Sequence, residues 1–343
     1  MLITHFQLLV PVFLLSISMT LASALFTPFN NSPKDSQPLP QPSTNITSNI
    51  GNLPFEAASF IEGSDVNGNV NSNNVELTAT QPMPEWLKKL TGLNIWPGLN
   101  PPYVPLDFID FNKIPKIPLR TQGVCPIIRN QCSFDCFKCV SHDDVYTCPK
   151  LSQTFDDGPS RHTHNLLKHL KNKSTFFTLG LNVVKYPEIY REIVQKGHLT
   201  GSHTWSHKFL PSLTNEEIIS QFQWSIWAMN VTGHHLPKWY RPPYGGIDDR
   251  VRSIARMFGM QAVVWDHDSF DWQMESIPQQ RTKKQILNDV MRWKEQGRGL
   301  ILEHDVYKST TDLGIEINKI LGSDQMTVAQ CVDGIDYVKV FPH

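Results

Sequence analysis

The chain has 343 residues, 40% of them hydrophobic, which suits one large α/β domain with additional segments. Its 31 basic and 32 acidic side chains give a formal net charge of -1. Proteins that bind nucleic acid concentrate Lys and Arg against the phosphates, so this balance argues against a nucleic-acid partner and favours a neutral one.

The N-terminus carries a mostly apolar run over residues 6–19, followed by Ala-Ser-Ala at 22–24. This pattern predicts a secretory signal peptide over residues 1–24, because the run is shorter than the roughly 20 apolar residues that span a bilayer. An uncleaved anchor is the alternative, since no Lys or Arg precedes the run. No second apolar segment is long enough to span a membrane, so we expect a secreted protein without a transmembrane segment.

Residues 25–120 are rich in Asn, Ser, Thr and Pro, which predicts a largely disordered or extended leader. Its second part, from residue 81, is expected to lie along the main domain. Four Asn-x-Ser/Thr sequons could carry glycans in a eukaryotic secretory route. They are Asn30, Asn45, Asn172 and Asn230.

Residues 121–150 hold five of the six cysteines and are predicted to be a disulfide-braced segment, because cysteines pair in an oxidising compartment. A zinc or redox site at the C-x-x-C spacing, or a small carbohydrate-binding module, is the alternative. Six cysteines allow fifteen connectivities, and we favour one pair, Cys148 with Cys331, because it would join the start of the main domain to its end. The six are Cys125, Cys132, Cys136, Cys139, Cys148 and Cys331.

From residue 151 to 343 short apolar runs alternate with helical periodicity, which predicts a parallel sheet flanked by helices. The predicted strands are 151–155, 174–179, 198–201, 239–241, 261–265 and 299–302. The predicted helices are 162–171, 187–196, 215–229, 248–258, 283–295 and 312–321. Polar residues cluster directly after these strands, at the edge where barrel enzymes place their chemistry.

Two of these polar clusters suggest a metal site. Asp156 and Asp157 precede Gly-Pro, and two adjacent carboxylates can divide metal binding and proton transfer, although a plain turn has the same composition. His203 and His207 are four residues apart, which puts both imidazoles on one side of a helical turn. Two surface histidines are the alternative. Two histidines and one carboxylate leave coordination positions open, as a catalytic metal requires.

Three further segments each follow a predicted strand, and each alone is typical of an ordinary polar loop. They are 241–245 (Arg-Pro-Pro-Tyr-Gly), 268–272 (Asp-Ser-Phe-Asp-Trp) and 302–305 (Leu-Glu-His-Asp). Taken in order with the two clusters above, they resemble the five motifs of the polysaccharide deacetylases of the NodB-homology type, carbohydrate esterase family 4. The resemblance covers roughly residues 145–325, and 203–211 and 223–235 are especially similar to fungal chitin deacetylases.

The resemblance implies an irregular (β/α) barrel with fewer than eight strands, occupying residues 151–343. It implies a metal-dependent hydrolase that removes N-acetyl groups from the N-acetylglucosamine residues of chitin, giving chitosan and acetate. We expect a monomer outside the cell or in the cell wall, a spore wall included. The alternatives are a deacetylase or esterase of another glycan, such as acetylxylan, and a non-catalytic wall protein that binds carbohydrate.

The resemblance also implies residue roles in the chemistry. Asp157, His203 and His207 would hold one divalent ion, usually Zn²⁺ and in some members Co²⁺. Asp156 would be the general base, and Arg241 would pair with it and keep it ionised.

A second group of residues would handle the leaving group and the acetyl group. His304 would protonate the departing amine, and Asp271 would hold its ring in the charged form. The backbone N–H of Tyr244 would stabilise the oxyanion. Trp265 and Leu302 would wall the acetyl methyl, and Trp272 would support the site. Glu303 departs from the family pattern and is expected to add a charge near His304.

Overall fold

A computed structural model describes residues 79–127 and 131–342 of the chain. The chain divides into two units, residues 1–53 and 54–343, and every described residue belongs to the second. The predicted signal peptide, the leader as far as residue 78 and the sequons at Asn30 and Asn45 lie outside the described residues.

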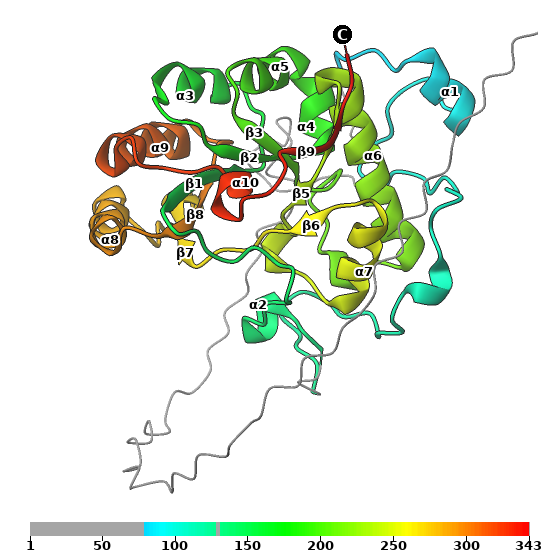
Figure 1. The fold of residues 1–343 in the computed structure, drawn as a ribbon, viewed down its shortest axis with the longest axis horizontal. Helices are drawn as coiled ribbons and strands as arrows, with labels where there is room; N and C mark the ends of the chain where they lie inside the picture. The colour runs from blue at the N-terminus through cyan, green and yellow to red at the C-terminus, as the bar shows by residue number, and fades with distance from the viewer. Residues whose placement is uncertain (1–78, 128–130, 343) are drawn as a thin grey trace, which may run out of the picture. The chain divides into compact units, whose positions relative to one another are not determined.

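A parallel sheet of seven strands, in the order β6-β5-β3-β2-β1-β8-β7, forms the centre of the second unit (Figure 1). Its strands are β1 (Leu151–Asp156), β2 (Thr175–Thr178), β3 (Leu199–Ser202), β5 (Trp239–Tyr240), β6 (Gln261–Ala262), β7 (His267–Asp268) and β8 (Gly299–His304). All residues of β1 are buried, as expected of a central parallel strand covered on both faces. The expected irregular barrel of fewer than eight strands is confirmed.

Every helix predicted for the main domain forms, with ends shifted by a few residues. The helices are α1 (Glu85–Thr91), α2 (Phe134–Phe137), α3 (Thr163–His169), α4 (Gly180–Lys185), α5 (Pro187–Gln195), α6 (Asn215–Gly233), α7 (Asp249–Met257), α8 (Lys283–Gln296), α9 (Lys308–Leu321) and α10 (Val328–Cys331). Helix α6 begins where predicted because Thr214 and Glu217 form a capping box. Among the described residues, no helix combines the length and apolar character needed to cross a membrane.

The short elements are those that the sequence pattern missed. They include α4, α10 and the antiparallel pair β4 (His235–Pro237) and β9 (Tyr337–Val340). Four 3-10 helices also form in the described part of the chain: η2 (Phe111–Lys113), η3 (Leu210–Ser212), η4 (Pro243–Gly245) and η5 (Asp271–Met274). Strand β7, with two residues, was missed as well. Segments of two to six residues are too short to show a periodic pattern, so the local sequence does not predict them.

Helices pack around the sheet in the spatial order α8, α9, α3, α5, α6, α7 (Figure 1). Phe155 of β1 and Phe176 of β2 stack with ring centroids 5.1 Å apart, and they pack against Leu166 of α3 and Ile193 of α5. These side chains are fully or almost fully buried, so the helices fix the sheet by removing apolar surface from water. The carboxyl ends of the strands are thereby held in fixed relative positions.

Residues 79–120 pack against the barrel although most of them lie outside regular structure. The backbone N–H groups of Thr80 and Gln81 both donate to the carbonyl of Val184. Trp96 is 4% exposed and belongs to the same buried cluster as Trp205. This stretch is therefore part of the packed unit that carries the barrel.

All six cysteines form disulfides: Cys125–Cys136, Cys132–Cys139 and Cys148–Cys331. The favoured bond between the start and the end of the main domain is confirmed. The other two bonds are local and brace α2. The structure describes the sequons at Asn172 and Asn230, and both asparagines are half-buried. The side-chain amide of Asn172 donates to the carbonyl of Gly322.

A buried imidazole directly before β3 predicts loss of stability in acid. His198 Nδ1 accepts the backbone N–H of Ser174 at 3.1 Å, and burial together with Lys173 and Lys196 lowers its pKa from 6.5 to about 4. As the pH falls, His198 is therefore protonated in the unfolded chain before it is protonated in the folded one. The stability that the neutral, hydrogen-bonded imidazole contributes is complete above pH 6.5 and is lost as the pH falls toward 4. We expect this group to account for about 2 kcal/mol of unfolding free energy lost between pH 7.5 and pH 5.

Urea unfolding at the two pH values measures this contribution. The matched variant is His198→Asn, whose amide oxygen can accept the same hydrogen bond without titrating. The variant should lose less stability on acidification than the wild type. Equal losses in the two proteins would contradict the prediction.

Candidate active site

The polar residues that follow separate strands meet at the carboxyl edge of the sheet. Asp156 ends β1 and His304 ends β8, and the register of these adjacent strands pairs the two residues directly. His203 follows β3, Arg241 follows β5, and Asp271 follows β7. Because the sheet is parallel, these ends all lie on one side of it.

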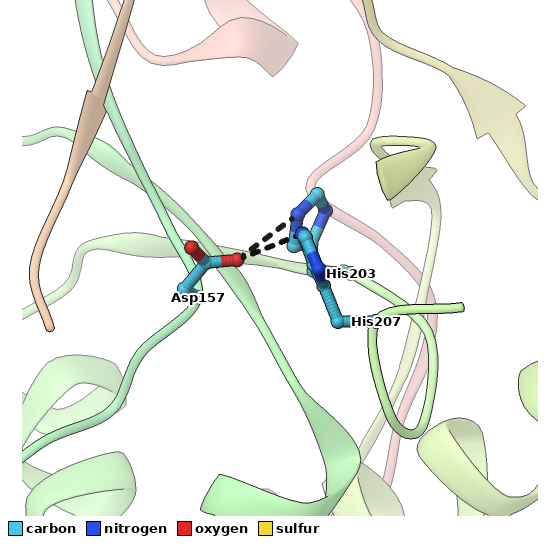
Figure 2. A group of neighbouring side chains, drawn as sticks. All are labelled: Asp157, His203 and His207. Atoms are coloured by element: carbon cyan, nitrogen blue, oxygen red, sulfur yellow. Dashed lines mark ion pairs between the residues drawn. The ribbon is translucent and has the colours of Figure 1, made fainter. Parts of the chain in front are cut away.

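Asp157, His203 and His207 converge on one point (Figure 2). The Asp157 Oδ1 atom lies 3.3 Å from the Nε2 atom of each histidine. All three side chains are buried, and His207 is the most exposed at 8%. Within the described residues, this is the cluster whose ligand atoms lie close enough together to hold one metal ion.

The two histidines are brought together by a tight turn, so the expectation of a helical turn was wrong. Residues 203–207 form a non-helical turn after β3, in which Thr204 has φ 71° and His207 has φ 58°. Asp157 also has a positive φ, 76°, at the end of β1. Such left-handed conformations are uncommon for residues other than glycine, and they cluster at functional sites.

The donor set fits a metal ion. His203 Nδ1 lies 2.8 Å from the carbonyl of Arg241, which can only accept, so Nδ1 carries the hydrogen and Nε2 presents its lone pair. Neither oxygen of Asp157 has a hydrogen-bond donor among the described residues. Ligands about 2.0–2.1 Å from a tetrahedral ion lie roughly 3.3 Å apart, which matches the observed spacing.

The electrostatics of the cluster favour the ligand forms of these groups. Burial opposes ionisation of Asp157, but the imidazoles of His207 and His203 lower the pKa of its carboxyl below the usual range. Burial also lowers the pKa of His207 to about 4. A carboxylate beside the neutral imidazole of His207 is a state that can bind a divalent cation.

Asp156 lies beside this cluster and is held by a buried arginine. Arg241 Nη1 donates to Asp156 Oδ1 at 2.8 Å and to Thr154 Oγ1 at 2.7 Å. The other carboxylate oxygen, Oδ2, lies 3.8 Å from His203 Nε2 and faces the side chains of the candidate metal site. Arg241 is fully buried, with its guanidinium 4.3 Å from the ring centroid of Phe177. Asp156 is thus fixed through one oxygen, with the second directed at the site.

His304 lies across from these groups and is coupled to Asp271. Its Nδ1 lies 2.6 Å from Asp271 Oδ1, and its backbone N–H donates to Oδ2 of the same carboxylate at 2.8 Å. Burial would lower the pKa of His304, but the Asp271 carboxylate, assisted by Asp157 and Asp156, raises it to about 10. The ring is therefore charged near neutral pH, and its Nε2 is left to exchange a proton.

The remaining predicted site residues lie on β8 or on the segments that follow β5, β6 and β7. Tyr244 lies in η4 with φ 59°, and its ring packs edge-on against His207 with centroids 4.4 Å apart. Trp265 donates its indole N–H to Asp268 at 3.1 Å. Leu302 is buried on β8, and Trp272 follows Asp271 in η5.

Glu303 does not add a charge beside His304, because successive residues of a strand point to opposite faces. Its side chain is fully buried behind the sheet, where Gln153 Nε2 donates to it at 3.1 Å. Burial, together with the Asp271 charge, raises the pKa of Glu303 well above its ordinary value. The expectation of an added charge directly beside His304 is therefore wrong.

Two residues near the site were not singled out from the sequence. Asp305 is fully buried, accepts from the hydroxyl of Thr163 at 2.6 Å and lies against Gly158, next to Asp157. Phe134 of the disulfide-braced segment packs edge-on against Trp265 with centroids 5.1 Å apart. The position of Asp305 after the fifth-motif histidine was a usable signal, whereas nothing local marks Phe134.

Comparisons with known proteins agree with this geometry. The pattern described as polysaccharide deacetylase matches residues 144–263. Chitin deacetylase 2 of Saccharomyces cerevisiae is 58% identical over 269 residues, which are 78% of this chain and 86% of that protein. Chitin deacetylase 1 of the same organism is 53% identical over 77% of this chain and 88% of that protein. The chain belongs to the polysaccharide deacetylase family.

Solved structures extend the agreement to the fold. A peptidoglycan N-acetylglucosamine deacetylase, Bc1960, superposes with a TM-score of 0.50 and 26% identity over 57% of this chain and 95% of its own. The chitin deacetylase of Colletotrichum lindemuthianum has a TM-score of 0.50 and 24% identity over 58% of this chain and 96% of its own. At 24% identity, the similarity to the Colletotrichum lindemuthianum enzyme shows the fold alone.

Proposed function

We propose that this protein is a metal-dependent chitin deacetylase that hydrolyses the N-acetyl groups of N-acetylglucosamine residues to give chitosan and acetate. The observation that carries the proposal is the meeting of Asp157, His203 and His207 beside Asp156 and His304. The identity to two chitin deacetylases over more than three quarters of the chain supports the substrate.

Asp156 is the general base of the proposed reaction. Its Oδ2 faces the metal ligands while Oδ1 is held by Arg241, so one oxygen can take a proton from the attacking water without the carboxylate turning away. A divalent ion held by Asp157, His203 and His207 supplies Lewis-acid polarisation and makes water more acidic. We propose Zn²⁺ as this ion, because two imidazoles and one carboxylate form a donor set typical of catalytic zinc.

His304 is the general acid. An amine leaves an amide readily only when it is protonated, and the Asp271 carboxylate keeps His304 charged for that transfer. The backbone N–H of Tyr244 stabilises the charge that develops on the carbonyl oxygen. Trp265 and Leu302 wall the acetyl methyl, and Trp272 supports Asp271 through its backbone N–H, which donates to Oδ1 at 2.9 Å.

The setting of the reaction is proposed to be the extracellular space or the cell wall, a spore wall included. Three disulfides with no free cysteine suit an oxidising compartment, and the apolar run at residues 6–19 suits export. We propose that the protein acts as a glycosylated monomer on insoluble or oligomeric chitin. Each described sequon asparagine retains some exposure, which a glycan requires.

Purified protein is expected to release acetate from chitin oligomers, and removal of the metal by a chelator should abolish the release. Re-addition of Zn²⁺ should restore it, because the ligands are already gathered. Mass spectrometry of the oligomers should show losses of single acetyl groups. Acetylxylan is tested in parallel. Acetate release from acetylxylan alone would show that the substrate is an acetyl ester and not chitin, and no acetate release from either substrate would contradict the proposal.

A further inference from the structure

A stretch of chain upstream of the family pattern lies against the turn that carries two of the metal ligands. This 96–104 segment precedes the matched residues 144–263. The indole N–H of Trp205 donates to the carbonyl of Gly98 at 2.8 Å, and the hydroxyl of Ser206 donates to the carbonyl of Leu99 at 2.7 Å. Two of the three residues between His203 and His207 thus bind this segment through their side chains.

Aromatic packing strengthens the same contact. Trp96 stacks on Trp205 with ring centroids 6.1 Å apart and meets Trp224 of α6 edge-on at 6.3 Å. Trp205 and Trp224 are fully buried and Trp96 nearly so. The indole N–H of Trp224 also donates to the carbonyl of Pro102 at 2.7 Å. The segment is therefore joined to the turn and to the helix that lies behind it.

The turn needs such support, because its backbone is in an unfavourable conformation. Thr204 has a branched Cβ and His207 a large ring, yet both have φ in the left-handed region. Residues in such conformations persist only when the surrounding structure fixes them. On the inner side, the turn presents His203 and His207 to Asp157. Contacts on its outer side therefore help to fix the turn, together with the backbone N–H groups of Gly180 and Leu181, which donate to it.

We infer that the 96–104 segment is a positioning element of the metal site, which holds the 203–207 turn so that both imidazoles face Asp157. The inference rests on the proposed function, because it takes this cluster to be the site of the ion. Trp96 packs on Trp205 and Trp224, and its indole N–H donates to the carbonyl of Gln81. It acts on the ligands only through Trp205, so it is a positioning residue. Its effect should appear in metal affinity before it appears in chemistry.

The test compares zinc dissociation constants of the full chain, measured by competition with a chromogenic chelator. Trp96→Ala should weaken zinc binding about tenfold or more, as removal of outer supports of metal ligands does elsewhere. Trp96→Phe should recover most of the affinity, because a ring still covers Trp205. The matched control is Trp86→Ala, which removes the same side chain from a 45%-exposed position in the same N-terminal stretch. That control should bind zinc as the wild type does.

A second variant keeps the inference testable where Trp96→Ala fails to fold, as judged by circular dichroism. Trp205→Phe retains an aromatic ring in the buried cluster but loses the donor to Gly98, so it should weaken zinc binding several-fold. At saturating zinc, both variants should regain more of the wild-type kcat than at limiting zinc. If the folded Trp96→Ala and Trp205→Phe variants bind zinc as tightly as the wild type, the inference is overturned. If the wild-type protein binds no zinc, the proposed function itself is overturned.

Discussion

Replacing Asp156 with asparagine is expected to lower kcat for acetate release from chitin oligomers by about 10³-fold, within the range typical of a lost general base. The amide oxygen can still accept from Arg241 Nη1, which holds Asp156 Oδ1 at 2.8 Å, so the side chain should keep its place. The amide has no basic oxygen to direct at the attacking water. The loss should therefore fall on kcat, with little change in KM.

The zinc dissociation constant separates this effect from damage to the metal site. Asp156→Asn should bind zinc within a few-fold of the wild type, because Asp157, His203 and His207 remain. Asp157→Asn is the matched variant one position along, and it should lose zinc affinity as well as activity. An Asp156→Asn enzyme with near-wild-type kcat would remove Asp156 from the mechanism.

The second large effect is expected at His304, and it should depend on the leaving group. His304→Gln should lower kcat on chitin oligomers by about 10²- to 10⁴-fold, because an amine leaves only with a proton. With 4-nitrophenyl acetate as the substrate, kcat of the same variant should fall at most about tenfold, since 4-nitrophenolate leaves without being protonated. The structural basis is the Asp271 carboxylate, 2.6 Å from Nδ1, which keeps the imidazole charged.

The ratio of the two losses is the informative quantity. A general acid gives a much larger loss on the amide than on the activated ester. Equal losses on both substrates would mean that His304 acts on a step common to them, such as stabilising the oxyanion. Zinc affinity and the urea midpoint of His304→Gln, measured alongside, show that the site and the fold survive the substitution.

Many features of the fold could be predicted because they are encoded by neighbours along the chain. Helix α6 begins at Asn215 because Thr214 and Glu217 close a capping box three residues apart. Strand β1 was predicted as a short run directly before the helix at 162–171, and all of its residues are buried although Ser152 and Gln153 are polar. The strand–helix alternation then restricts the arrangement to a parallel sheet, whose carboxyl edge gathers the polar ends.

Other features depend on surfaces that meet only after folding. Nothing near Cys125 in the sequence selects Cys136 over its other possible partners. The side chain of Glu303 is buried on the face of β8 opposite His304, which local charge counting does not reveal. Trp96 meets Trp205 more than a hundred residues away along the chain, through packing that has no periodic signal.

The sequence by itself determined which residue types are available for the chemistry and the order in which they occur. Only the tertiary structure decided that the side chains of Asp157 and the two histidines converge on one point. It also showed that the histidines lie on a tight turn with left-handed residues and not on a helix. The physical reason is that hydrogen bonding and side-chain period act over a few residues, whereas a metal site needs atoms about 3.3 Å apart that come from distant strands. Strand register and the packing of the 96–104 segment supply that proximity.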